Sequence, residues 1–223
     1  MLEDFEVEHV IKPFDRLSKS YDKGRLGWYN GMLRLLGDRA QEPLLDAGCG
    51  TGYIACLLAR KGLQRIVCLD VSWNMLVSAR NRARKWELEG ALDFIQGSIV
   101  FLPFRQKAFE TVLAAAVVHH VHGRRWRIKA LRELKEVCRG FALITVWCLF
   151  DPNNLLRAVS MLSRDVLVGK NGKNKRYYHL YTPLELRRDL RSSGYESFKL
   201  YLWDYKRVLL KRNIVVEYYA REA

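Results

Sequence analysis

The sequence has no long hydrophobic run, although hydrophobic residues make up 49% of its 223 residues. A membrane-spanning helix needs about 20 consecutive apolar residues, and no uninterrupted stretch approaches that length. The acidic start, Met1 to Asp4, also lacks the basic and then apolar order of a signal peptide. We therefore expect a cytoplasmic protein without membrane contact.

Paired cysteine motifs are absent as well. The five cysteines are scattered, and no C-x-x-C pair occurs. Most of them lie in apolar segments, which is typical of core thiols rather than of disulfides or zinc sites. Internal repeats and low-complexity tracts are also lacking, and the length suits one domain with a substantial core. The sequence thus predicts a single domain without a metal site.

What the sequence does contain is an alternation of strand-like and helix-like segments, which favours an α/β fold with a mostly parallel sheet. The last two predicted strands have no helix between them, so we expect an antiparallel hairpin. The segment from Val168 to Lys175 contains two glycines and three lysines and is expected to be a mobile loop. Strands are predicted near 43–47, 65–70, 91–96, 109–118, 141–148, 195–203 and 213–220, and helices near 52–61, 73–86, 124–138 and 183–193.

The first predicted strand runs directly into three glycines at alternate positions, within Leu44 to Gly52. Glycines permit close backbone approach, so the N–H groups of such a loop can face a ligand at the following helix N-terminus. The spacing is shorter than the G-x-G-x-x-G pattern of dinucleotide sites. Asp70 ends the second strand, where a carboxylate can accept hydrogen bonds from ribose hydroxyls or simply cap the next helix.

With Asp46 two residues before the first glycine, the loop resembles motif I of the class I S-adenosylmethionine-dependent methyltransferases. The resemblance implies a doubly wound, seven-stranded, mostly parallel Rossmann-like sheet with a C-terminal antiparallel hairpin. Trp73 or Met75 would pack under the adenine. Ser98 stands where many relatives have an aspartate that binds the adenine amine, and its hydroxyl is a weaker acceptor. The residues expected to hold S-adenosylmethionine are Asp46, Gly48, Gly50, Gly52, Asp70 and Ser98.

Elements further along the chain resemble the family that methyl-esterifies carboxymethyluridine at the tRNA wobble position. They are the pairs His119-His120 and Arg124-Arg125, Val146-Trp147 at the end of a strand, and Arg-Tyr-Tyr-His-Leu-Tyr from Arg176 to Tyr181. The last two are the more specific. This resemblance implies one methyltransferase domain over residues 1–223, with an N-terminal helical lid at 1–38 and an inserted substrate-side segment at 150–182.

A carboxylate acceptor is already ionised at neutral pH, so it needs positioning and charge matching rather than a general base. Arginines and histidines are therefore expected around it. Each candidate also has a structural alternative, such as a solvated helix arginine, a core histidine or a tyrosine at the core edge. We expect Arg25, His119 and Arg176 to act on the acceptor, and His120, Arg124, Arg125, Trp147, Tyr177, Tyr178 and His179 to bind the substrate.

The charge balance indicates a polyanionic partner, because 38 lysines and arginines face 24 acids, giving a net charge of +14. We expect this partner to be tRNA, gripped at its anticodon stem-loop by the basic final third of the chain. A basic surface without a partner is the plain alternative. Relatives in the wobble-uridine family often need a small zinc-containing activator protein. Two other functions stay open: a quinone-type small-molecule methyltransferase, and a cofactor-binding, tRNA-binding subunit without turnover.

Overall fold

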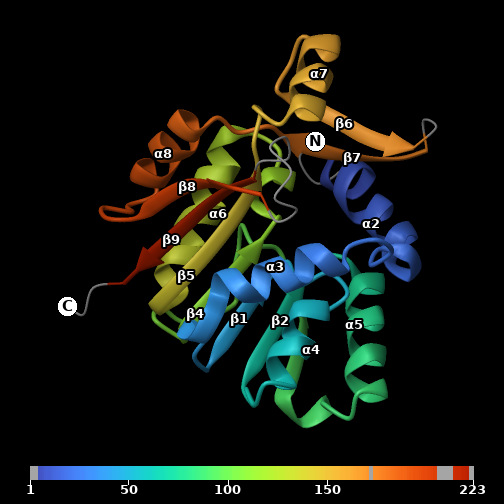
Figure 1. Ribbon diagram of the computed structural model, residues 1–223, viewed down its shortest axis with the longest axis vertical. Helices are drawn as coiled ribbons and strands as arrows, with labels where there is room; N and C mark the ends of the chain where they lie inside the picture. The colour runs from blue at the N-terminus through green and yellow to red at the C-terminus, as the bar shows by residue number, and fades with distance from the viewer. Residues whose placement is uncertain (1–4, 171–172, 205–212, 221–223) are drawn as a thin grey trace.

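The computed structural model describes residues 5–170, 173–204 and 213–220. Within them, seven strands form one sheet in the order β3-β2-β1-β4-β5-β9-β8 (Figure 1). The first five are parallel, and β9 runs antiparallel to both β5 and β8. This is the predicted fold. The strands are β1 Leu44–Ala47, β2 Ile66–Asp70, β3 Leu92–Gln96, β4 Phe109–Ala115, β5 Cys138–Trp147, β8 Lys199–Trp203 and β9 Asn213–Tyr219.

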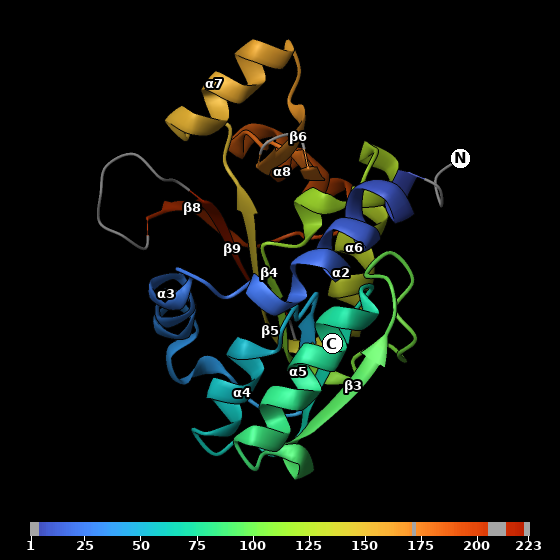
Figure 2. The same ribbon diagram turned by 90° about the vertical axis from the view of Figure 1, so that its right-hand side faces the viewer.

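Helices cover both faces of the sheet (Figure 2). One face packs on an apolar cluster that includes Met32 and Ile54, and the other on a cluster that includes Leu134 and Leu190. All four residues of β1 are buried, as expected for a parallel strand that is covered on both sides. The first face carries α3 Leu26–Leu36, α4 Tyr53–Ala59 and α5 Trp73–Lys85, and the second α6 Arg124–Val137 and α8 Pro183–Ser192.

Two further segments lie at the carboxyl ends of the parallel strands, where the sequence predicts a lid and a substrate-side insertion (Figure 1). The N-terminal segment contains the π-helix η1, α2 and the 3-10 helix η2, and it contacts the second segment through β7. The insertion between β5 and α8 contains α7 and a separate two-stranded sheet. The bounds are η1 Val7–Ile11, α2 Lys12–Leu17, η2 Ser18–Ser20, α7 Pro152–Met161, β6 Asp165–Lys170 and β7 Lys173–His179. The other 3-10 helices are η3 Gly37–Arg39, η4 Glu89–Ala91 and η5 Val118–His120.

Several sequence-based predictions differ from the structure; for example, β5 begins at Cys138 instead of 141. β4 ends at Ala115 instead of 118, because Ala116 has a φ of +58° and the chain then turns into η5. β8 begins at Lys199 instead of 195, because the buried Tyr195 turns toward α6 and donates its hydroxyl to the Leu131 carbonyl, 2.9 Å away. The mobile-loop prediction for 168–175 is wrong for 168–170 and 173–175, which belong to β6 and β7, while 171–172 lie outside the described residues. Lysines there indicated a loop, but lysine is also typical of exposed edge strands.

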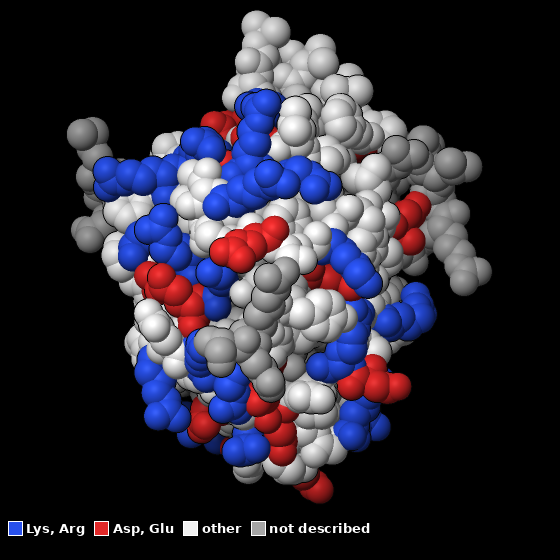
Figure 3. Space-filling model, turned by 90° about the vertical axis from the view of Figure 1, so that its left-hand side faces the viewer, with Lys and Arg blue, Asp and Glu red and all other residues white. Residues whose placement is uncertain are grey.

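The surface in Figure 3 is rich in lysine and arginine. A band of these side chains crosses the face that includes α8, on which Arg187, Arg188 and Arg191 are exposed. Above the band, where α7 projects in Figure 1, this face carries little charge. Across the described residues, no helix combines the length and the hydrophobicity that a bilayer crossing requires.

Candidate active site

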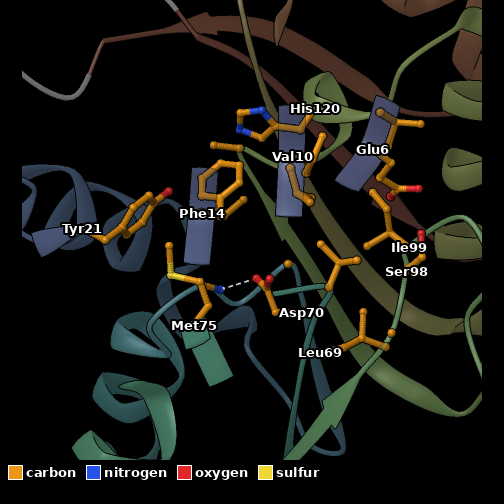
Figure 4. A pocket seen from close by; sticks show the side chains of 18 residues that line it. Glu6, Val10, Phe14, Tyr21, Leu69, Asp70, Met75, Ser98, Ile99 and His120 are labelled. Carbon is orange, nitrogen blue, oxygen red and sulfur yellow. Dashed lines mark hydrogen bonds between the residues drawn. The ribbon is translucent and has the colours of Figure 1, made fainter. Parts of the chain in front are cut away.

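A cleft opens at the carboxyl ends of β1, β2 and β4, beneath the N-terminal segment (Figure 4). The glycine loop and Asp70 form its lower side. Val10, Phe14 and Tyr21 cover it from above. These three residues come from the first 21 positions, so the first part of the predicted lid segment lies over the glycine loop, while α3, which belongs to the same predicted segment, covers a face of the sheet.

The glycine loop has the backbone that its sequence requires. Gly48, Gly50 and Gly52 have φ angles of +78°, +56° and +65°, in the region that favours glycine. A Cβ at Gly48 would collide with the Val117 side chain, and one at Gly52 would lie 2.7 Å from the Ala79 Cβ. Gly48 and Gly50 line the cleft, whereas Gly52 begins α4 behind it. The first two glycines therefore provide the ligand-facing backbone, and the third provides close packing.

Asp70 lines the cleft at the end of β2, as predicted. Its Oδ2 accepts the Gly50 N–H at 2.8 Å and its Oδ1 accepts the Ser72 N–H at 2.9 Å. Each oxygen keeps a second lone pair for a hydroxyl donor. Burial raises the pKa of this carboxyl to about 6, against the opposing effect of the backbone hydrogen bonds.

Asp46 lies below the loop and not on the cleft lining. It is 2% exposed, and its Oδ2 has no hydrogen-bond partner among the described residues. Burial, and then the charge of Asp70, raises its pKa to about 7. Asp46 is thus a buried carboxyl that feels the charge of Asp70 and does not line the cleft.

The opposite end of the cleft is more apolar. Ser98 and Ile99 follow β3 and line it, and the Ser98 Oγ accepts the Val100 N–H at 3.3 Å. Of the two side chains considered for packing under an adenine, Met75 is 1% exposed and lines the cleft, whereas Trp73 is 60% exposed. The structure therefore places Met75 in that position.

Two aspartates attach the lid to the cofactor side, and no local sequence pattern indicates their partners. The Asp22 Oδ1 accepts the Thr51 hydroxyl at 2.6 Å and the Tyr29 hydroxyl at 2.5 Å, and its Oδ2 pairs with Arg82. The Asp15 Oδ1 accepts the hydroxyl of Ser72, the N-cap of α5, at 2.5 Å. These contacts join residues up to 60 positions apart, a distance at which local patterns are uninformative.

Aromatic rings stack beyond the end of β4. The Tyr178 ring stacks on Trp147, with centroids 4.1 Å apart, and on His119, with centroids 5.3 Å apart. The His119 Nδ1 accepts the Trp147 N–H at 3.2 Å, while its buried Nε2 has no partner among the described residues. Burial, together with nearby positive charge that includes Arg176, lowers the pKa of His119 well below its ordinary value. His119 is therefore neutral.

His120 lines the cleft itself. Its Nδ1 lies 2.7 Å from the Tyr177 carbonyl, so Nδ1 carries the proton and Nε2 is left as an acceptor. Burial is the main cause that lowers its pKa to about 3, and the charges of Arg176 and Arg25 lower it further. Both predicted histidines thus meet at one place, but neither carries a charge.

Two predicted arginines reach the same region. Arg25 lies over the Tyr21 ring at 4.0 Å. Arg176 lies between the Phe14 ring, at 5.6 Å, and the Tyr178 ring, at 5.5 Å, and its buried Nε has no hydrogen-bond partner among the described residues. Arginines stacked on aromatic rings keep their donors available for an anion.

A second cavity adjoins the cleft at Ala116, which lines both. Its walls are mainly polar, with three cationic side chains, two indoles and several amide groups. The lining consists of Lys23, Arg25, Trp28, Ala116, Trp147, Asp151, Asn153, Asn154, Arg157 and Asn213. We call it the cationic cavity.

Comparison with known proteins gives a matching family model and a shared fold. The family model described as "Methyltransferase domain" matches residues 44–140, from β1 into β5. An S-adenosylmethionine-dependent methyltransferase of Methanosarcina mazei has the same fold, with a TM-score of 0.70, covering 85% of this chain and 98% of its own at 18% identity. Residues 44–140 thus match a methyltransferase domain, and the solved structure shows the same fold over most of the chain.

Curated relatives of this methyltransferase differ in what their names say. A protein of Encephalitozoon cuniculi named only as a methyltransferase is 29% identical over 189 residues, which cover 79% of this chain and 82% of the relative. A demethylmenaquinone methyltransferase of Thermotoga maritima is 30% identical over 155 residues, which cover 66% of this chain and 64% of that enzyme. The name of the second relative specifies an acceptor, demethylmenaquinone, which is a quinone.

The cleft of this methyltransferase fits S-adenosylmethionine. Gly48 and Gly50 leave open backbone where a Cβ would intrude, Asp70 offers two acceptor oxygens, and Met75 and Ile99 offer apolar surface for a base. Among the described residues, no group of three or more His, Cys, Asp or Glu could hold a metal ion.

Several predicted substrate residues of the methyltransferase have structural partners instead. Arg124 pairs at 2.8 Å with Asp189, a fully buried carboxyl of α8, and Arg125 stacks on Trp126 at 4.5 Å. Neither lines the cleft or the cationic cavity, so their prediction as substrate ligands is not supported by position. Both arginines begin a helix, where sequence does not distinguish solvated from functional side chains.

The aromatic motif on β7 likewise contains some residues with structural partners and others that lie near the cleft. His179 is 3% exposed, with Nδ1 2.6 Å from Asp165 and Nε2 2.9 Å from Glu185, so it joins β6 to α8. The Tyr177 hydroxyl also donates to Asp165, at 2.6 Å. Only Arg176 and Tyr178 of this motif face the stacked rings near the cleft, because side chains alternate along a strand.

Proposed function

We propose that this methyltransferase esterifies a carboxylate, and that its acceptor is the carboxymethyl group of a wobble uridine in tRNA. The observation that carries the proposal is the cationic cavity beside Ala116, where Lys23, Arg25 and Arg157 face the end of the cofactor cleft. An anionic acceptor gains from this charge, whereas a neutral acceptor does not.

Methyl transfer to a carboxylate requires little acid or base catalysis from the protein. S-adenosylmethionine supplies an electrophilic methyl group, and a carboxylate accepts it without losing a proton. His119 and His120 are held neutral, and Asp151 of the cationic cavity is occupied by the Asn153 and Asn154 N–H groups. Arg25 and Arg176 would hold the carboxylate, and the buried rings would exclude water.

An RNA partner is supported by charge and surface. The chain carries a net charge of +14, α8 has exposed arginines, and a basic band crosses the face of the molecule that includes α8 (Figure 3). Phosphates neutralised by such side chains release counterions, which makes binding strong at low salt. We propose that tRNA contacts this band through its anticodon stem-loop. A zinc-containing activator protein and a cytoplasmic location belong to the same proposal.

A second candidate function is the methylation of a quinone-type small molecule, and the names of the relatives favour it over the first. A separate cavity beside the adenine end of the cleft is largely apolar, with Val100, Phe101 and Trp126 among its walls. Phe101 is 61% exposed. Such a surface suits a neutral ring or an isoprenoid chain.

Incubation with labelled S-adenosylmethionine separates these candidates. The substrates are tRNA carrying carboxymethyluridine, the same tRNA without it, and a short-chain demethylmenaquinone. We expect label in a base-labile nucleoside ester of the first substrate alone, identified by mass spectrometry after nuclease digestion. Label in the quinone alone would replace the proposal by the second candidate. Cofactor binding by calorimetry without transfer to any substrate, even with an activator supplied, would indicate a subunit without turnover.

A further inference from the structure

The inserted helix α7 presents two unlike surfaces. It carries exposed apolar residues, including Leu156 and Val159, and the exposed Leu162 follows it. Its first two turns also contribute Asn153, Asn154 and Arg157 to the lining of the cationic cavity. The cationic cavity adjoins the cofactor cleft, so the surface of α7 that lines this cavity is the one that can contact an acceptor.

The first turn of α7 is fixed to the end of β5. The Asp151 Oδ1 caps the helix by accepting the N–H groups of Asn153 at 3.0 Å and Asn154 at 3.2 Å. Asn154 is 5% exposed, and its side-chain amide donates to the Cys148 carbonyl at 2.9 Å. Its Oδ1 then accepts an N–H of Arg157 at 3.1 Å. Arg157 is thus oriented through a short chain of hydrogen bonds that begins on the sheet.

The cations of this cavity lack carboxylate partners. Among the described residues, neither Lys23 nor Arg157 lies within ion-pair distance of an acid. Lys23 comes from the lid and Arg157 from the insertion, so two separate segments bring charge to the same place. Positive groups that are left unpaired at a cavity wall are available to phosphate oxygens.

Two indoles share the cavity with these cations. Trp147 has the Tyr178 ring stacked on it and is itself only partly buried. Trp28 lies at the start of α3, with its ring edge-on to Tyr29 at 5.3 Å. Indole faces next to lysine and arginine are a common surface for an unstacked base and its backbone.

We propose that the cationic cavity is a nucleotide site, in which Lys23 and Arg157 bind the phosphates beside the modified nucleotide and Trp28 contacts its base. Trp147 and Arg25 then lie between this nucleotide and Ala116, where the cofactor cleft begins. This inference rests on the proposed function and names the contacts by which its RNA acceptor is recognised.

The test uses Lys23→Gln, Arg157→Gln, Trp28→Ala and Trp28→Phe, with Arg105→Gln as the control. Arg105 is an exposed arginine just before β4, at the opposite end of the strands. Two quantities are measured for each: the KM and kcat for an anticodon stem-loop RNA carrying carboxymethyluridine, and the affinity for a fluorescein-labelled uridine pentanucleotide at several salt concentrations. Calorimetry with S-adenosylhomocysteine verifies that each variant keeps its cofactor site.

Each loss of a cation should raise KM and the pentanucleotide Kd by about 10-fold. It should also reduce the slope of log affinity against log salt by about 0.7. Trp28→Ala should weaken binding by about 5-fold or more, and Trp28→Phe should restore most of it. The control should match the parent protein in all of these measurements.

The outcomes separate the two proposals. If the parent methylates RNA but the three loss variants match it, the nucleotide site is wrong and the proposed function stands. If the parent methylates no RNA but the variants still lose pentanucleotide binding, the site stands and the proposed function is wrong. A parent that neither binds nor methylates RNA refutes both.

Discussion

The pH dependence of cofactor binding follows from the carboxyl of Asp70. Burial raises the pKa of this group to about 6 in the free protein, and its two oxygens face the cleft and the glycine loop. Ribose hydroxyls donate to the ionised form, whereas the protonated form loses an acceptor. Cofactor affinity should therefore fall as the pH decreases through 6.

The size of this effect can be worked out. If only the carboxylate form binds, the apparent Kd scales with one plus the ratio of protonated to ionised Asp70. With a pKa of about 6, the Kd rises about 11-fold from pH 8 to pH 5, or ~1.4 kcal/mol. Asp70→Asn should lower affinity at pH 8 by about 1.5 to 3 kcal/mol, because a charged acceptor is lost. The variant should also lose this pH dependence.

The assay is calorimetry with S-adenosylhomocysteine from pH 5 to pH 8 at constant ionic strength. Titration of the ligand's own groups is common to all variants, so the difference between the parent protein and Asp70→Asn isolates this carboxyl. Asp93→Asn serves as the control, because Asp93 is an exposed acid on the neighbouring strand β3. Parallel pH profiles for the parent and Asp70→Asn would refute the assignment of Asp70 to the ribose.

Three further substitutions test residues that support the site without lining it. Gly52→Ala should lower the free energy of unfolding by about 2 to 5 kcal/mol in urea titrations, since its φ is +65° and the new Cβ would lie 2.7 Å from that of Ala79. Burial raises the pKa of Asp46 to about 7, so this carboxyl should destabilise the folded state without ligand by on the order of 4 kcal/mol as the pH rises from 4 to above 7, in addition to the loss that the raised pKa of Asp70 causes over the same range. Asp46→Asn should flatten that curve, and an unchanged slope contradicts the buried carboxyl. Arg124→Gln should cost about 1 to 3 kcal/mol in thermal and urea unfolding, because Asp189 loses its partner, and should leave kcat/KM for RNA unchanged.

The cofactor half of this methyltransferase was predictable because its signals are local. The Leu44 to Gly52 segment contains a strand, a loop and a helix start within nine positions, and each residue type has a direct backbone reason. Asp70 follows from the same logic, since it ends the next strand. The terminal hairpin follows from the missing helix between the last two predicted strands, whereas the seven-stranded topology was implied by the family resemblance and not by the alternation of elements.

The acceptor half was predictable only in part, because its contacts are distant in sequence. The motif from Arg176 to Tyr181 indicated a segment that does lie near the cleft, but it could not tell that Tyr178 stacks on Trp147 while His179 joins Asp165 to Glu185. That division depends on which side of β7 faces the cleft. Residues 150–182 likewise contain the helix α7 and the β6–β7 hairpin, which their basic and polar sequence did not indicate. The residues that these elements contact lie on other elements.

The two neutral histidines indicate the electrostatic character of the acceptor side. Burial is the first cause of their low pKa values, but the charge of Arg176 lowers both and the charge of Arg25 lowers that of His120 as well. The same positive potential that disfavours a proton on imidazole favours a carboxylate at that place. A neutral quinone gains nothing from this positive potential. The same potential would hinder a general base at that place, because it disfavours the protonated form of the base. Fixed arginines beside unprotonated histidines are therefore an arrangement that suits an acceptor which arrives already ionised.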